Sequence, residues 1–135
     1  MNALFYLKLY LLTVPVFFAI DLLWLGVIAK GLYQKNLGHL LSPAVNWPAA
    51  VAFYLIYIAG ILLFAVRPAL AEQALAKAAL WGALFGFFTY ATYDLTNLAT
   101  LKDWPFTIVV VDIAWGSLLC TMVACVSYLI GRWLG

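Results

Sequence analysis

Three aspartates lie within long hydrophobic stretches, where a charged side chain is costly. Asp21, Asp94 and Asp112 are three of the five acidic residues of the chain. A charged carboxylate near the middle of a membrane helix costs roughly 2.5–3.5 kcal/mol. Because a carboxyl group can transfer a proton or hold a cation, we predict these three as catalytic residues, acting as general acids or bases or as metal ligands. In the alternative interpretation they are hydrogen-bonded and only hold helices together.

Aromatic and polar residues that could bind a ligand lie close to the aspartates in the sequence. The pattern Asp-x-x-Trp occurs twice, once at Asp21 and once at Asp112. Asn97 follows Asp94 within the most polar of the hydrophobic stretches, and tyrosines precede it. Tryptophan and tyrosine are also common at membrane interfaces, so a purely structural role stays open for them. The predicted binding residues near the aspartates in the sequence are Asn97, Tyr90, Tyr93, Trp24 and Trp115. Tyr54 and Tyr57 are added because they lie near the start of another hydrophobic stretch, residues 49–66, which begins on the same side as the aspartates.

The residue types that usually bind metals or cofactors form no recognisable motif. His39 is the single histidine, and Cys120 and Cys125 are spaced so that they fall on different sides of a helix. The sequence also has no glycine-rich phosphate loop. No cofactor is therefore required, and the cofactor stays unknown. A divalent metal bound by the aspartate carboxyl groups stays an open alternative.

The composition predicts that lipid surrounds most of these residues. The chain is 68% hydrophobic and 9% charged, unlike a soluble globular domain. A membrane span needs about 20 apolar residues, and four stretches fit: residues 5–29, 49–66, 78–101 and 106–130. We predict one all-α membrane domain over residues 1–135, a four-helix bundle with a short interfacial helix between spans one and two. The net charge of +2 without a basic tract argues against nucleic-acid binding.

Four spans would bring the aspartates toward one face of the membrane. At 1.5 Å per residue, Asp21 and Asp94 lie ~6 and ~7 Å beyond the middle of their spans, and Asp112 lies ~9 Å before the middle of its span. Since spans one and three run in one direction and span four runs back, all three displacements point to the same leaflet. Both termini are expected at the opposite face, and a small excess of Lys and Arg favours a cytoplasmic location for that face.

The third predicted span also carries a helix-packing pattern. Gly82 and Gly86 form the spacing Gly-x-x-x-Gly, which lets two membrane helices approach closely. At 100° per residue, Tyr93 and Asn97 fall within about 20° of Gly86, with Asp94 at about 80°. The packing surface thus continues into the polar surface, and we expect this helix at the centre of the bundle.

Three functional hypotheses fit these features. In the first, an acid-lined cavity near one leaflet binds or modifies a membrane lipid or another amphiphile. In the second, a homodimer carries a proton, a cation or a small solute past the same carboxylates. In the third, the protein is a structural or regulatory membrane subunit. Whether it is an enzyme is left open.

Three segments resemble a known family. Residues 18–26, around Asp21 and Trp24, residues 90–105, with the run Tyr-Asp-Leu-Thr-Asn, and residues 111–116, around Asp112 and Trp115, are together similar to the DUF2177 family. The resemblance extends over nearly the whole chain. It implies a multi-pass protein of the bacterial inner (cytoplasmic) membrane and no particular activity.

Overall fold

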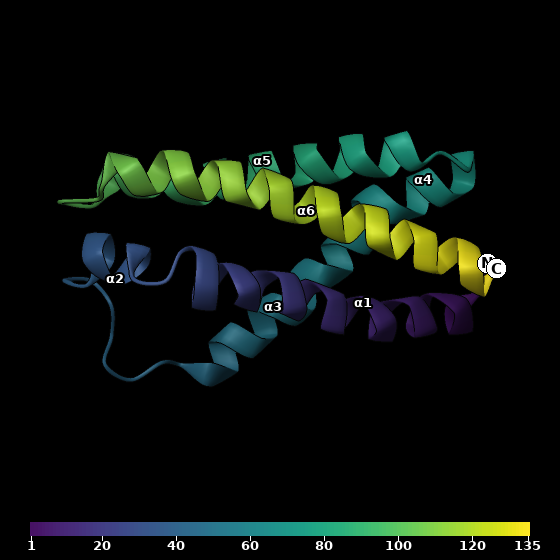
Figure 1. Ribbon diagram of the computed structural model, residues 1–135, viewed down its shortest axis with the longest axis horizontal. Coiled ribbons are helices and arrows are strands. Elements are labelled where there is room, and N and C mark those ends of the chain that lie inside the picture. Colours follow the sequence, from purple (N-terminus) through teal and green to yellow (C-terminus); the bar gives the residue numbers. More distant parts are fainter.

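The chain folds into helices joined by short connections. The computed structural model describes residues 1–135, and four long helical segments lie roughly along one axis (Figure 1). Two of them contain a π-helical turn. In order, the elements are α1 (Ala3–Leu23) with η1 (Trp24–Ile28), α2 (Leu32–Leu37), α3 (Trp47–Ile61) with η2 (Leu62–Val66) and α4 (Arg67–Glu72), α5 (Leu75–Thr100), and α6 (Phe106–Leu134).

Three segments are long and apolar enough to cross a membrane: Ala3–Ile28, Trp47–Glu72 and Phe106–Leu134. Large apolar side chains cover their outer surfaces. Ile56, Leu22 and Phe106, for example, are each more than 60% exposed. Water would not stabilise such a surface, whereas lipid tails would.

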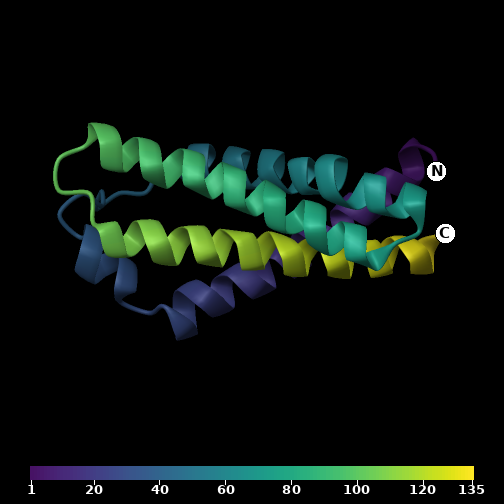
Figure 2. The ribbon, with the colours of Figure 1, turned by 90° about the horizontal axis from the view of Figure 1, so that it is seen from above.

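The fourth long helix, α5, packs antiparallel along α6 (Figure 2). It has 26 residues but is more polar than the other three segments. Gly82 and Gly86 face α6, and a Cβ atom on Gly82 would lie 2.6 Å from the Cys120 carbonyl oxygen. Gly86 lies against the backbone of Gly116. The predicted glycine packing surface therefore lies in the α5–α6 interface.

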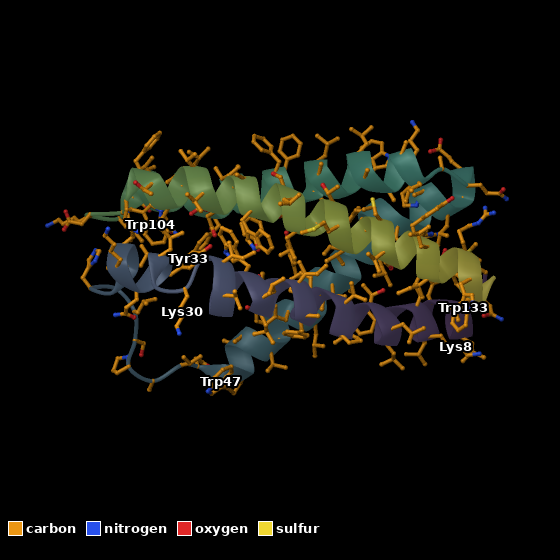
Figure 3. All side chains as sticks on the ribbon, viewed as in Figure 1. Lys8, Lys30, Tyr33, Trp47, Trp104 and Trp133 are labelled. Atoms are coloured by element: carbon orange, nitrogen blue, oxygen red, sulfur yellow. The ribbon has the colours of Figure 1, made fainter.

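The connections gather at two ends of the molecule. Both termini lie at one end, while α2 and the turn between α5 and α6 lie at the other (Figures 1 and 2). The α3 helix crosses obliquely (Figure 1), and its first residue, Trp47, lies away from α5 and α6 (Figure 3). Its continuation through η2 and α4 packs against both helices.

One helical segment continues beyond its predicted end. The second expected span stops at residue 66, whereas the helix continues through Arg67 and Pro68 to Glu72. Pro68 lies where the π-helical turn η2 gives way to α4, so the proline falls at a change in the helical hydrogen-bond pattern. In the first segment Pro15 lies inside α1, and the π turn η1 follows farther along, at Trp24. The polar connection contains a helix of only six residues, α2.

Candidate functional site

Asp112 on α6 is hydrogen-bonded to the short helix α2. Tyr33 donates its hydroxyl proton to Asp112 Oδ1 over 2.9 Å. The Trp24 Nε1–H group in turn donates to the Tyr33 hydroxyl over 3.0 Å. Figure 3 shows Tyr33 pointing toward α6, whereas Lys30 points away. Burial, followed by the nearby Asp112 charge, raises the pKa of the Tyr33 phenol above its ordinary value, so the phenol stays a proton donor.

Asp21 on α1 is contacted from two other helices. Its Oδ1 accepts a hydrogen bond from Trp115 Nε1 at 3.4 Å, and its Oδ2 accepts one from the Tyr54 hydroxyl at 3.5 Å. Both contacts are long for hydrogen bonds. The Asp21 side chain is 8% exposed, so its carboxyl group is buried although both of its hydrogen bonds are weak.

The tryptophan of each Asp-x-x-Trp motif is linked to the aspartate of the other motif, across α1 and α6. Because the helices are antiparallel, Trp115 reaches Asp21, while Trp24 reaches Asp112 through Tyr33. The two indole rings stack between them, with centroids 4.4 Å apart and planes 7° from parallel. The repeated tetrapeptide therefore builds one connected cluster.

A cavity of about 300 Å³ adjoins this cluster, and we call it the aspartate cavity. Its wall comes from α1, α2, α3, α5 and α6, and from the connections between them. No lysine or arginine lines it. Its lining residues are Asp21, Trp24, Leu25, Tyr33, Leu37, Leu41, Tyr54, Tyr90, Tyr93, Ile108, Asp112 and Trp115.

A second space of about 370 Å³ lies between α3 and α5, and we call it the α3–α5 groove. Phe53, Tyr57 and Thr89 line it, together with three residues that it shares with the aspartate cavity: Tyr90, Tyr93 and Asp112. Phe53 and Tyr93 are 51% and 54% exposed, so the groove opens to the outer surface of the helices. The two spaces therefore adjoin at Asp112.

Asp94 is placed differently from the other two aspartates. Its side chain is fully buried, and neither carboxyl oxygen has a hydrogen-bond partner. It lies near Asp112, so the two carboxyl groups repel each other when both are charged. Asp94 lines neither the aspartate cavity nor the α3–α5 groove, and the same holds for Asn97, which lies beside Tyr93.

The remaining predicted residues fall into these two spaces. Trp24, Trp115 and Tyr54 line the aspartate cavity, Tyr57 lines the groove, and Tyr90 and Tyr93 line both. Tyr57 also contacts Thr89 Oγ1 at 2.7 Å and Cys120 Sγ at 3.1 Å. No three His, Cys, Asp or Glu side chains come together in a way that could hold a metal ion.

Tyr33 is the main residue of the site that the sequence did not identify. Its position in a short polar connection gave no sign of contact with Asp112. One signal was available, because Tyr33 and Leu37 are four residues apart and share a helix face. Leu37 packs with Trp104, Ile108 and Val109, and this contact holds α2 against the start of α6.

Comparison with known proteins identifies the family. No curated protein and no solved structure matches the chain. The model of a family described as "Predicted membrane protein (DUF2177)" matches residues 6–129, which is most of the chain. The sequence resemblance is thus confirmed, and the chain belongs to the DUF2177 family of predicted membrane proteins.

Proposed function

We propose that all four long segments cross the membrane as a bundle, with α2 at the interface near the aspartates. The polar residues of α5 are compatible with lipid, because Thr92, Thr96 and Thr100 each donate their hydroxyl proton to a carbonyl one turn earlier. The Asp94 side chain is hidden from the surface. By the family resemblance, the membrane is the bacterial inner membrane.

The proposed activity is binding of an amphiphile, with its head group in the aspartate cavity and its chain in the α3–α5 groove. The observation that carries this proposal is the junction of the two spaces at Tyr90, Tyr93 and Asp112. Both carboxyl groups, Asp21 and Asp112, line the aspartate cavity, whereas the groove extends from Asp112 along Phe53 and Tyr57 and opens between helices. A lipid or a similar molecule has the same division into a polar and an apolar part.

Binding fits the site better than chemical modification of the ligand. Asp21 and Asp112 are engaged with indole and phenol donors. The Cys120 thiol is buried against Tyr57, and His39 is exposed outside both spaces. No activated nucleophile therefore faces the proposed ligand.

A photoreactive fatty alcohol with a diazirine in its chain tests this proposal. After cross-linking in a neutral detergent, modified residues are expected in the segments that contain Phe53 and Thr89. Leu25→Trp should lower the cross-linking, because Leu25 lines the aspartate cavity. Leu22→Trp is the matched control, since Leu22 is 61% exposed on the same helical segment and lines neither space. Uniform labelling of all four helices, unaffected by Leu25→Trp, would contradict the proposal.

A second candidate is transport of a proton or cation by a dimer. It is favoured by Asp94, whose buried carboxyl group has no partner except the neighbouring Asp112. Strong repulsion between two buried carboxylates is relieved when a proton or a cation lies between them. Vesicles containing the protein should then show a proton or cation flux that Asp94→Asn abolishes. Absence of flux from wild-type vesicles would reject this candidate.

A further inference from the structure

We infer that the amphiphile bound by the aspartate cavity carries a positively charged ammonium head group. The inference rests on the proposed binding function and specifies its ligand class. It follows from the charge of the cavity, the unused acceptor capacity of its carboxyl groups and the aromatic character of its walls.

The charged groups of the cavity are all carboxyl groups. Asp21 and Asp112 are each 8% exposed and line the cavity, and no basic residue joins them. The lysines of this end of the molecule, Lys30, Lys35 and Lys102, have exposed side chains and do not line it. A phosphate, sulfate or carboxylate head group would therefore meet like charge without a counterion, whereas a cation would be attracted.

The carboxyl groups also have capacity for a further partner. Asp112 receives one hydrogen bond, from Tyr33 to Oδ1, and the two bonds to Asp21 are 3.4 and 3.5 Å long. Asp94 adds a third, fully buried carboxyl group beside Asp112 and has no hydrogen-bond partner. Partnerless buried carboxyl groups are costly, so this arrangement favours a ligand that brings positive charge close to Asp112.

The aromatic walls distinguish an ammonium group from a bare metal ion. Six aromatic side chains line the cavity: Trp24, Tyr33, Tyr54, Tyr90, Tyr93 and Trp115. Faces of such rings attract alkylammonium groups, because the negative face of the ring's π-system favours a nearby cation. A divalent metal instead needs several oxygen ligands at one point, and no three suitable side chains converge. The combination of aromatic rings and carboxyl groups fits an organic cation.

Twelve-carbon amphiphiles that differ only in the head group provide the test. Radiolabelled dodecyltrimethylammonium is titrated onto the protein in dodecyl maltoside micelles, and dodecylammonium, dodecanol and dodecanoate are used as competitors. We expect saturable binding, with dodecylammonium displacing the probe at a micellar mole fraction at least about tenfold lower than dodecanol does. Dodecanoate should be the weakest competitor.

Substitutions connect this selectivity to the cavity. Asp112→Asn should weaken binding of dodecyltrimethylammonium about tenfold while leaving that of dodecanol within about twofold. Asp21→Asn provides a second variant should Asp112→Asn fail to give a monodisperse protein. Asp103→Asn is the matched control, because Asp103 is exposed in the α5–α6 turn and lines neither space. It should leave the affinity of every probe unchanged.

The outcomes separate this inference from the proposed function. If dodecanol and dodecyltrimethylammonium both bind saturably with equal affinity, the ammonium inference is wrong and amphiphile binding stands. If micromolar Mg²⁺ or Ca²⁺ displaces the probe, the cavity is a metal site and the inference is also wrong. If no twelve-carbon probe binds saturably, both the inference and the proposed function fail.

Discussion

At the scale of single residues, the three aspartates have three different surroundings. Asp112 accepts a hydrogen bond of 2.9 Å from Tyr33, Asp21 accepts two longer ones, and Asp94 accepts none. The three carboxyl groups therefore differ in how many hydrogen bonds hold them in place. Asp112 joins α2 to α6, and Asp21 joins α1 to the aromatic residues of α3 and α6, whereas Asp94 has no structural partner that would explain its presence.

Removal of the Tyr33 hydroxyl should destabilise the fold. Tyr33→Phe leaves Asp112 without its donor and Trp24 Nε1 without its acceptor, and an unsatisfied buried polar group costs about 1–3 kcal/mol. The midpoint of unfolding in mixed micelles of dodecyl maltoside and sodium dodecyl sulfate should fall accordingly. Tyr6→Phe is the control, because the Tyr6 hydroxyl contacts only the Met1 sulfur at 3.9 Å. Equal midpoints for the two variants would show that the Trp24–Tyr33–Asp112 chain contributes nothing to stability.

Asp94→Asn should leave the protein as stable as the wild type or make it more stable. The substitution keeps the size of the side chain, and a neutral amide costs less to bury than a charged carboxyl group does. It also removes the interaction with the Asp112 carboxyl group. Unfolding in the same mixed micelles measures the effect, and Asp103→Asn supplies the exposed control. A clear loss of stability specific to Asp94→Asn would mean that Asp94 is a structural residue with a partner in the membrane.

At the scale of secondary structure, the close contact between α5 and α6 depends on glycine from both helices. Gly86 lies against Gly116, and the space beside Gly116 is filled by the ring of Tyr90. Tyr90 then lines both the aspartate cavity and the α3–α5 groove. The distance between the two helices therefore determines the position of a predicted ligand contact.

Gly86→Leu should prevent normal packing of α5 on α6. Any Cβ at this position would overlap the Gly116 backbone, so the helices would have to separate, and overpacking of a tight contact costs about 1–3 kcal/mol or more. Loss of a sharp monodisperse peak in size-exclusion chromatography is expected. Gly26→Leu is the matched control, because nothing lies within 4 Å of a Cβ at Gly26. Similar elution profiles for the two leucine variants would contradict the close glycine contact.

The helices were easier to predict from the sequence than the site. Long apolar stretches indicated an all-helical membrane protein, and the spacing of Gly82 and Gly86 indicated a packing surface. The opposing Gly116 could not be identified, because it depends on the register of two helices distant in sequence. The same reason explains why the exchange of tryptophans between Asp21 and Asp112 was not foreseen. Tyr33 joins the site through the packing of Leu37, a tertiary contact that local pattern does not specify.

At the scale of the whole molecule, the buried acidic residues are concentrated toward one end of the helices. The aspartate cavity includes residues of α2 and lies toward the end opposite the two termini. Lys30 and Trp104 lie at that end, while Lys8 and Trp133 lie at the terminal end (Figure 3). Lysine and tryptophan are typical of the two membrane interfaces, so the arrangement suits the proposed bundle, with the proposed binding site near one face of the bilayer.

This arrangement predicts where an impermeant thiol reagent can reach the chain in sealed inverted and right-side-out vesicles. Single cysteines at Asn2 and Gly135 should be labelled from one side, and a cysteine at Ser42 from the other, in a Cys125→Ser background that retains the buried Cys120. With four spans, α1 and α6 bring both termini to the same face. If α5 did not cross, the three segments Ala3–Ile28, Trp47–Glu72 and Phe106–Leu134 would leave the termini on opposite faces. Labelling of Asn2 and Gly135 from opposite sides would therefore reject the four-span bundle, and with it the placement of all three aspartates near one leaflet.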